Sequence, residues 1–367
     1  MLKAGIIGLP NVGKSTLFNA LVRAHLAPAA NYPFCTIEPN RGVVAVPDPR
    51  LDALARVVGV ETRIPAAIEF VDIAGLVRGA SRGEGLGNQF LAHIREVDAL
   101  VHVVRCFDDP DVAHVTGTPD PLRDIEIVLT ELILADLEVL RRRRERLARE
   151  IRAGNKAAQT EDQLWQRVQT HLESGRPAST AGLSRDEETL LSACPMLTAK
   201  PTVLAANVRE EQLARLDSDP RVRAVRQYAR EHHGCETVAL CAQLESDLVD
   251  LSPDEAAEYL RSLGITETGV NELIRATWRL LNLRTFFTFN EREVRAWTIP
   301  AGTPAAKAAG RIHTDFERGF IRAERVFWKD LVEAGSVARA REQGHYAHEG
   351  RDYEVRDGDV LLFRFHV

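Results

Sequence analysis

A glycine-rich run near the start of the chain has the residue types and spacing that hold a phosphate group. Residues 8 to 15 read GLPNVGKS and fit the pattern GxxxxGK[ST]. In this pattern backbone N–H groups surround the β-phosphate, Lys14 reaches the β- and γ-phosphate oxygens, where it is a predicted catalytic residue, and Ser15 ligates Mg²⁺. The run therefore predicts a nucleoside triphosphate site with Mg²⁺, and its remaining predicted nucleotide contacts are Asn11, Val12, Gly13 and Thr16.

An apolar strand and a helix must frame this loop. LKAGII, residues 2 to 7, predicts the strand, and the helix is expected to begin at about Lys14. Further apolar runs are typical of buried parallel strands, and helical stretches separate them. Their alternation predicts an α/β fold, a doubly wound domain. These runs are IEFVDIAG (68–75), ALVHVVRCF (99–107) and TVLAAN (202–207).

Two later segments place further groups that a nucleotide switch needs. NYPFCTIEPN, residues 31 to 40, supplies Thr36, which is expected to complete the Mg²⁺ shell and sense the γ-phosphate. DIAG follows a strand, so that Asp72 is placed to hold Mg²⁺ through water and Gly75 to offer its N–H to the γ-phosphate. Either segment alone would be an ordinary loop. Three segments in this order predict a nucleotide switch.

Residues 203 to 210, VLAANVRE, occupy the place where many P-loop switches carry NKxD, whose aspartate pairs with guanine. Here Val208 stands at the lysine position and Glu210 at the aspartate position. Asn207 could accept from the N6 amine of adenine and donate to N7. The stretch favours ATP over GTP, with residual GTP binding. Capping of the following helix is the structural alternative for Asn207.

The residue that would support hydrolysis is not obvious. Ras-like switches place a glutamine directly after the glycine of DxxG, and Leu76 stands there instead. His114, on the loop after the third strand, could position water, or it could merely pack a turn. Asn11 could help to coordinate K⁺, which would supply positive charge without an arginine. Both remain hypotheses, and without such help turnover should be slow.

Composition limits the remaining choices. The chain has 367 residues, 45% of them hydrophobic, and a formal net charge of −6, so a protein that coats nucleic acid with its whole surface is excluded. Five scattered cysteines indicate neither a disulfide framework nor a zinc site. A glycine-rich motif that begins at Gly8 leaves no room for a signal peptide, and no run of eighteen apolar residues indicates a membrane span. A cytoplasmic protein is expected.

Composition also changes twice along the chain. An insertion at 125–198 keeps a three/four leucine spacing and predicts an antiparallel helical hairpin, with Arg141 to Arg144 mostly on its exposed face. That cluster is either a solvated face or a contact with ribosomal RNA or a partner. From 281 to 367 short alternating strands and one helix predict a small α+β module. Residues 1–280, with the insertion, would form the nucleotide-binding domain.

Together these motifs resemble the YchF group of Obg-like ATPases over nearly the whole chain. The resemblance is carried by GLPNVGKST, NYPFCTIEPN, DIAGLVRGASRGEGLGNQFL and AWTIPAGTPAAKAAGRIHTDFERGFIRAE. It implies that the insertion is that group's helical domain and that the C-terminal module is a TGS domain. It also implies ATP preference, with the Val208 backbone close to the base and CAQLE (241–245) as the outer loop of the pocket, so that Cys241 and Ala242 contact the nucleotide.

The leading interpretation is a Mg²⁺-dependent ATPase acting as a nucleotide-operated switch. The resemblance implies the ribosome or its RNA as a partner. Two alternatives stay open: a GTPase with an atypical base pocket, and a nucleotide-regulated RNA- or ribosome-binding protein with negligible turnover. A monomer is expected, because the hairpin's own packing uses its apolar seam.

Overall fold

The structure, a computed structural model, describes residues 2–27, 40–73, 86–115, 117–192 and 194–366. The chain divides into two compact units. The first contains the described parts of Met1–Ala24, Ile37–Gly42 and Glu69–Thr277, and the second those of His25–Thr36, Val43–Ile68 and Trp278–Val367. Residues 43 to 68, which the sequence places in the nucleotide-binding domain, therefore group with the C-terminal module.

A six-stranded sheet carries the phosphate loop, and its strand order is β2-β4-β1-β5-β6-β7. All of its printed neighbours from β4 to β7 pair in parallel, so their carboxyl ends meet at one edge. The central β5 is buried along its whole length, as a sheet covered on both faces requires. The strands are β1 (Lys3–Ile7), β2 (Arg41–Ala45), β4 (Ala67–Asp72), β5 (Ala99–Arg105), β6 (Thr202–Asn207) and β7 (Thr237–Leu240).

Four of the described helices begin at an Asp-Pro or Ser-Pro pair, which is a start signal in the sequence. In each case the Asp or Ser side chain accepts a hydrogen bond from a backbone N–H of the first turn, and the proline needs no donor there. These helices are α2 (Pro49–Val58), α4 (Pro121–Arg152), α8 (Pro220–Tyr228) and α10 (Pro253–Ser262). Of these, α2 belongs to the second unit. Further helices of the first unit, besides those of the hairpin region, are α1 (Lys14–His25), α3 (Leu86–Arg95), α7 (Glu210–Leu213), α9 (Ala242–Leu248) and the greater part of α11 (Gly269–Leu280), with a π-helix at Ala229–His233.

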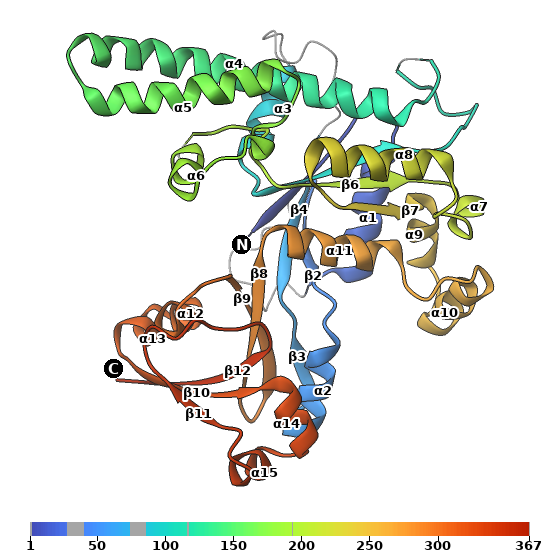
Figure 1. Cartoon of the computed structure of the whole chain (residues 1–367). Coiled ribbons are helices and arrows are strands. Elements are labelled where there is room, and N and C mark those ends of the chain that lie inside the picture. Colours follow the sequence, from blue (N-terminus) through green and yellow to red (C-terminus); the bar gives the residue numbers. More distant parts are fainter. Residues whose placement is uncertain (1, 28–39, 74–85, 116, 193, 367) are drawn as a thin grey trace. The chain divides into compact units, whose positions relative to one another are not determined.

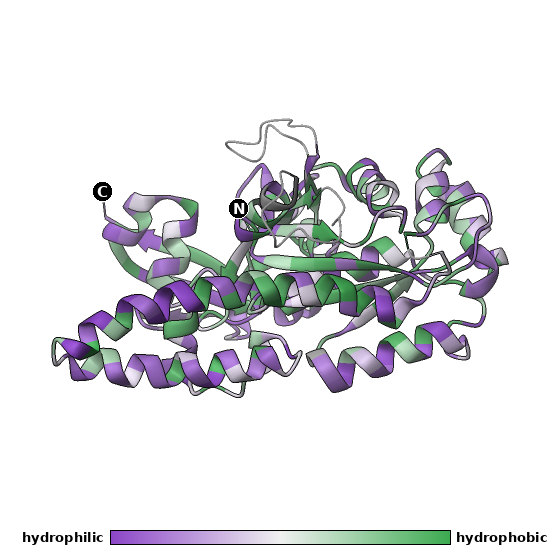
Figure 2. Ribbon diagram, turned by 90° about the horizontal axis from the view of Figure 1, so that it is seen from above, coloured by the Kyte–Doolittle hydropathy of each residue, from purple (hydrophilic) through white to green (hydrophobic). Residues whose placement is uncertain are grey.

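The predicted helical hairpin is present, formed by α4 and α5 (Lys156–Glu173), which lie side by side in Figure 1. Its two helices pack through a shared apolar core that includes Leu140, Trp165 and Val168. Outside this seam the hairpin is largely hydrophilic (Figure 2). The first turns of α4 instead pack in the core of the sheet, where Ile125 joins Val104. Beyond the hairpin come a 3₁₀ turn (Ala178–Thr180) and α6 (Arg185–Ser192).

The second unit is built on another six-stranded sheet, of order β11-β10-β12-β8-β9-β3. An alanine-rich face of α12 packs in a core with Phe286 and Phe363. The sequence indicated one helix here, whereas the described C-terminal residues form four short ones. The elements are β3 (Thr62–Ile64), β8 (Leu283–Phe289), β9 (Glu293–Pro300), β10 (Phe320–Phe327), β11 (Ala347–Glu349), β12 (Asp359–Phe365), α12 (Ala305–Ile312), α13 (Thr314–Arg318), α14 (Trp328–Ala334) and α15 (Val337–Glu342).

Segment 43–68 joins this unit through strand pairing and through α2. The short β3 pairs in parallel with the edge strand β9, from Thr62 against Glu293 to Ile64 against Arg295. Arg50 of α2 forms an ion pair with Asp357. Among the described helices of both units, none has the length and apolar character needed to span a membrane.

Candidate nucleotide site

The phosphate loop connects β1 to α1 and depends on two glycines. Gly8 has φ 148° and Gly13 has φ 96°, both in the region that side chains rarely adopt. A Cβ atom on Gly8 would lie 2.5 Å from the carbonyl oxygen of Val103, and one on Gly13 would lie 2.3 Å from the Asn207 amide nitrogen. Both positions therefore exclude any larger residue, which explains the spacing of the motif.

Lys14 begins α1 and its side chain is buried. Its Nζ donates a hydrogen bond to the Leu9 carbonyl oxygen at 2.8 Å, so that the ammonium group lies over the loop. Burial lowers the Lys14 pKa, and the nearby Asp72 carboxylate opposes that effect. A buried ammonium group within the charge field of one carboxylate is well placed to attract phosphate oxygens.

Ser15 and Asp72 meet, as the motifs predicted. The Ser15 hydroxyl donates to Asp72 Oδ2 at 2.7 Å, because β1 and β4 are paired and Asp72 lies opposite Ile6. The other carboxylate oxygen, Oδ1, is buried and accepts no hydrogen bond from the described residues. Mg²⁺ prefers hydroxyl and carboxylate oxygens, so this pair fits a Mg²⁺ ion. The other two predicted switch residues, Thr36 and Gly75, lie outside the described residues, as does Leu76.

Asn207, at the end of β6, connects the phosphate loop to the base side of the site. Its Nδ2 donates to the Val12 carbonyl oxygen at 2.9 Å, and its Oδ1 accepts from the Ala242 N–H at 3.0 Å. One N–H and one lone pair remain for a ligand. The side chain does not cap α7, whose N-cap is Arg209. Asn207 thus joins the phosphate loop to the start of α9, which the sequence did not indicate.

A pocket of about 450 Å³ opens beside these residues. Glu210, at the aspartate position of the NKxD pattern, accepts a hydrogen bond from the Tyr259 hydroxyl of α10 at 2.7 Å. Cys241 caps α9 and lines the pocket, and its contact with the nucleotide stays a prediction. The described lining comprises Asn11, Gly13, Thr16, Phe107, Asp109, Val112, Asn207, Val208, Arg209, Glu210, Glu211, Cys241, Ala242, Gln243 and Leu244.

The loop after β5 closes one side of the pocket and is organised by a buried arginine. The Arg105 guanidinium donates to the carbonyl oxygens of Phe107, Asp109 and Val112 at 3.0 to 3.2 Å. It also lies 4.8 Å from the centre of the Phe107 ring. The sequence analysis did not name Arg105, although a charged residue at the end of a mostly apolar strand was a usable signal.

The same loop contacts both other parts of the site. Asp109 forms an ion pair with Arg209, beside the base side of the pocket, at 3.0 Å. The Ala113 carbonyl oxygen accepts from Asn11 Nδ2, in the phosphate loop, at 3.1 Å. Asn11 has φ 60°, and its amide oxygen is the atom that a K⁺ ion would use.

His114 lies in the protein interior. Its side chain is only 1% exposed, and its Nε2 lies 2.8 Å from Oδ2 of Asp124 in the first turn of α4. Among the described residues that line the pocket, His114 is absent. The predicted catalytic histidine is therefore on the expected loop but does not face the pocket. Asp124 is a partner that the sequence analysis did not name.

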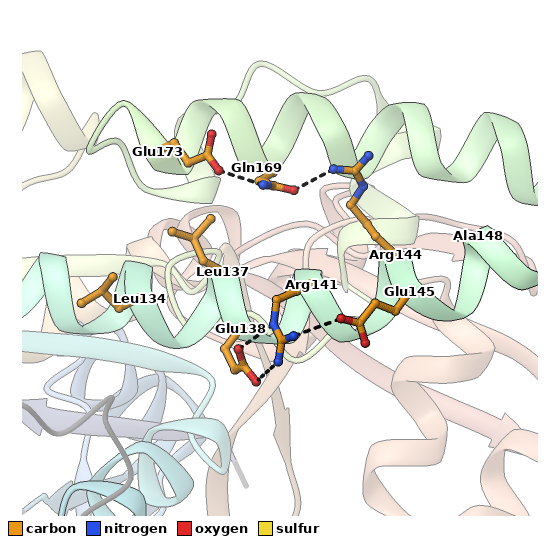
Figure 3. A pocket seen from close by; sticks show the side chains of 9 residues that line it. All are labelled: Leu134, Leu137, Glu138, Arg141, Arg144, Glu145, Ala148, Gln169 and Glu173. Carbon is orange, nitrogen blue, oxygen red and sulfur yellow. Dashed lines mark hydrogen bonds and ion pairs between the residues drawn. The ribbon is translucent and has the colours of Figure 1, made fainter.

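Each arginine of the hairpin cluster forms an ion pair with an acidic side chain, and Figure 3 shows this for Arg141. Arg141 pairs with Glu138 and Glu145 on its own helix, and Arg144 pairs with Asp162 of α5. A groove between the helices is lined by aliphatic residues and by these ion pairs. The arrangement agrees with the solvated-face alternative, and contact with RNA stays a prediction.

Comparison with known proteins places this arrangement in a family. Residues 3–136 match the family described as 50S ribosome-binding GTPase, and residues 283–366 match the YchF GTPase C-terminal family, described as a protein of unknown function (DUF933). The chain is 51% identical to the ribosome-binding ATPase YchF of Pasteurella multocida, covering 100% of this chain and 99% of the relative. It is 47% identical to the Bacillus subtilis protein of the same name, covering 100% of both.

A solved structure agrees over almost the whole chain. The YchF GTPase of Schizosaccharomyces pombe superposes with a TM-score of 0.89 at 37% identity, covering 99% of this chain and 97% of that one. The bacterial relatives are named ATPases, whereas the yeast protein is named a GTPase. The names therefore do not agree on whether the nucleotide carries adenine or guanine. The identity over full length, together with the phosphate loop and the paired Ser15 and Asp72, shows that the chain belongs to the YchF family.

Proposed function

We propose that the protein is a Mg²⁺-dependent ATPase that acts as a nucleotide-operated switch on the ribosome. The observation that carries the proposal is the group formed by Lys14, Ser15 and Asp72. A buried ammonium group, a hydroxyl and a carboxylate with one buried, unbonded oxygen are the set that a Mg²⁺–triphosphate would complete. Mg²⁺ would supply positive charge at the β- and γ-phosphates.

ATP is proposed as the preferred nucleotide. Glu210 is held by Tyr259, so it is directed toward α10 rather than free to take the position of the guanine-reading aspartate. The remaining N–H and lone pair of Asn207 match the N7 and N6 amine of adenine. A site with an aspartate that pairs with guanine rejects ATP, because buried polar groups left unmatched by adenine cost about 1 to 3 kcal/mol each. Without that aspartate the site discriminates less strongly against ATP.

Hydrolysis is proposed to depend on His114 and on K⁺ at Asn11. His114 is in the loop that contacts the phosphate loop through Asn11, and a local rearrangement would bring its ring toward the γ-phosphate. Asn11 keeps its amide oxygen for a cation, since its amide nitrogen bonds to Ala113. Thr36 and Gly75 are proposed to complete the Mg²⁺ shell and the γ-phosphate contacts. Slow basal turnover follows from the interior position of His114.

The ribosome is the proposed partner, because curated relatives of nearly equal length are named ribosome-binding ATPases. The hairpin and the C-terminal module, proposed to be a TGS domain, are the surfaces for that contact, and the chain is proposed to act as a monomer in the cytoplasm. A second candidate, a ribosome-binding protein whose turnover is incidental, is favoured by one observation: His114 does not line the pocket.

The test is parallel measurement of binding and multiple-turnover hydrolysis of ATP and GTP, with Mg²⁺ and either K⁺ or Na⁺. Tighter ATP binding with turnover that rises in K⁺ supports the proposal. Equal affinities would remove the base preference, and tight binding without turnover would favour the second candidate. His114→Ala should abolish turnover and leave nucleotide affinity unchanged; undiminished turnover would remove the histidine from the mechanism.

A further inference from the structure

His114 has a specific reason to stay in the interior, and the reason is a carboxylate on another element. The side chain of Asp124 is 3% exposed, and its Oδ2 atom lies 2.8 Å from Nε2 of His114. One proton between His114 Nε2 and Asp124 Oδ2 holds the two side chains together. The other oxygen, Oδ1, is buried and accepts no hydrogen bond from the described residues. The histidine is thus the side chain that satisfies this buried carboxylate.

The position of this carboxylate is defined by α4, whose start is capped and whose middle is bonded to another segment. Asp120 caps the helix by accepting from the Arg123 N–H at 3.2 Å. Asp136, three turns beyond Asp124, accepts from the Leu197 N–H, the Thr198 N–H and the Thr198 hydroxyl at 2.6 to 2.8 Å. These bonds join α4 to the segment that leads into β6. The first turn of α4 therefore presents Asp124 at a defined position.

The loop that carries His114 is fixed differently at its two ends. Its first half is held by three bonds from Arg105, and this half lines the pocket. The residue after Ala113, His114, has a buried side chain that contacts Asp124 of α4. The same loop therefore serves the nucleotide with one part while its histidine is bound to a helix.

We propose that Asp124 is a positioning residue that retains His114 away from the nucleotide, so that the first turn of α4 controls when this histidine reaches the γ-phosphate. This inference rests on the proposed function, in which His114 supports hydrolysis. It assigns slow basal turnover to retention of a competent residue, rather than to lack of one. Release requires that the Nε2–Oδ2 contact be broken.

The test compares Asp124→Asn with a matched control, Asp120→Asn. Both replace one aspartate of the first helical region by its amide, and asparagine caps helices as well as aspartate, so the control keeps α4 intact. Asp124→Asn removes the charge that retains His114, and we expect basal ATP turnover to rise by roughly tenfold, because hydrogen bonds to charged groups are the stronger ones. Asp120→Asn should leave turnover unchanged.

The second readout is the reactivity of the histidine itself. Carbethoxylation by diethyl pyrocarbonate, followed by peptide mass spectrometry, measures access to the His114 ring. His313, whose side chain is 61% exposed, is an internal reference in the same protein. We expect His114 to react at least about tenfold more slowly than His313 in the wild type, and to approach it in Asp124→Asn.

The outcomes separate the inference from the function on which it rests. Lower or unchanged turnover in Asp124→Asn, with His114 still required, would overturn retention and make Asp124 an orienting residue. Wild-type His114 that reacts as fast as His313 would overturn retention without any variant. If His114→Ala turns over normally, the catalytic assignment fails instead, and so does its control by α4. If the rise in ATP turnover caused by Asp124→Asn disappears in the double variant His114→Ala, Asp124→Asn, both the catalytic role of His114 and its retention by Asp124 would be supported.

Discussion

The region of the nucleotide site and the helical hairpin both contain many charged side chains. Near the site they are buried with few partners, whereas on the hairpin they are exposed and paired with each other. Beside the pocket, burial raises the pKa of Glu245 to about 7, against backbone bonds that lower it. On the hairpin, hydrogen bonds from Arg141 and Arg142 lower the pKa of the exposed Glu138 to about 2. Charge held in the interior with few partners marks a place where a ligand or a conformational change acts, whereas exposed charges paired with each other mark a stable surface.

The largest effect should come from the interior charge of the phosphate loop. Lys14→Met keeps much of the side-chain volume and removes the ammonium group. We expect ATP turnover to fall by about 10² to 10³, the typical loss when one group that stabilises transition-state charge is removed. Steady-state kinetics would measure it. Lys156→Met, in the first turn of α5 on the hairpin, is the control and should behave as wild type; equal losses in both would erase the difference between the two regions.

Glu245 should make stability depend on pH. Its folded-state pKa of about 7 lies above the ordinary value of 4.5, so the folded protein retains a proton that the unfolded chain releases. The free energy of unfolding therefore falls as pH rises from about 4.5 to about 7, and is flat above that range. Glu245→Gln still accepts from the Gly269 N–H and should be more stable at pH 8 by up to about 3 kcal/mol.

Urea denaturation at pH 5 and pH 8 would measure this effect. Glu258→Gln, an exposed glutamate of α10, is the control and should keep the wild-type dependence on pH. A wild-type protein that is equally stable at both values, or a Glu245→Gln variant that keeps the slope, would mean that burial of this carboxyl does not govern its proton.

Asn207→Ala should weaken the whole site and should weaken ATP binding most. The change leaves the Val12 carbonyl and the Ala242 N–H without their partner, at a cost of about 2 kcal/mol in the free energy of unfolding. Affinities for both nucleotides should fall, and the affinity for ATP should fall further, because the proposed contacts with N7 and the N6 amine of adenine are lost as well; titration with each nucleotide would show both effects. Gln243→Ala, at the pocket lining, should do neither. Equal losses for ATP and GTP would mean that Asn207 only holds the two loops together and does not read the base.

The smallest effect is expected on the hairpin surface. Arg142 is 68% exposed and pairs with Glu138 on the same helix. Surface pairs of this kind contribute little, so Arg142→Ala should not measurably change the midpoint of unfolding or the affinity for ATP. The support that Glu138 gains from its arginines is present above its ordinary pKa and is lost only as pH falls toward 2. A large loss of stability at neutral pH would show that the network does more than the exposure suggests.

Local motifs account for the part of this molecule that the sequence could predict. The phosphate loop, the meeting of Ser15 with Asp72 and the hairpin follow from fixed spacings, since a strand, a loop and a helix can each be read within about twenty residues. The two glycines of the loop are explained by close contacts that only a structure displays.

The remainder depends on partners distant in the chain. Nothing near His114 indicates that it turns toward α4, because Asp124 acts as its partner only once the loop has folded back. Asn207 was interpreted as a reader of the base, and its bonds to Val12 and Ala242 cross separations of 195 and 35 residues. Segment 43–68 joins the C-terminal unit through a three-residue strand, too short to leave a periodic pattern.

The central claim is that the incompletely paired carboxylate beside the phosphate loop binds Mg²⁺ together with the nucleotide. The direct measurement is calorimetric titration of ATP into the wild type and Asp72→Asn, with Mg²⁺ and with chelator. We predict that Mg²⁺ tightens ATP binding to the wild type by about tenfold or more, and that Asp72→Asn loses most of this gain. An unchanged gain in Asp72→Asn would contradict the account, because the ion would then be held without the carboxylate that the structure places there.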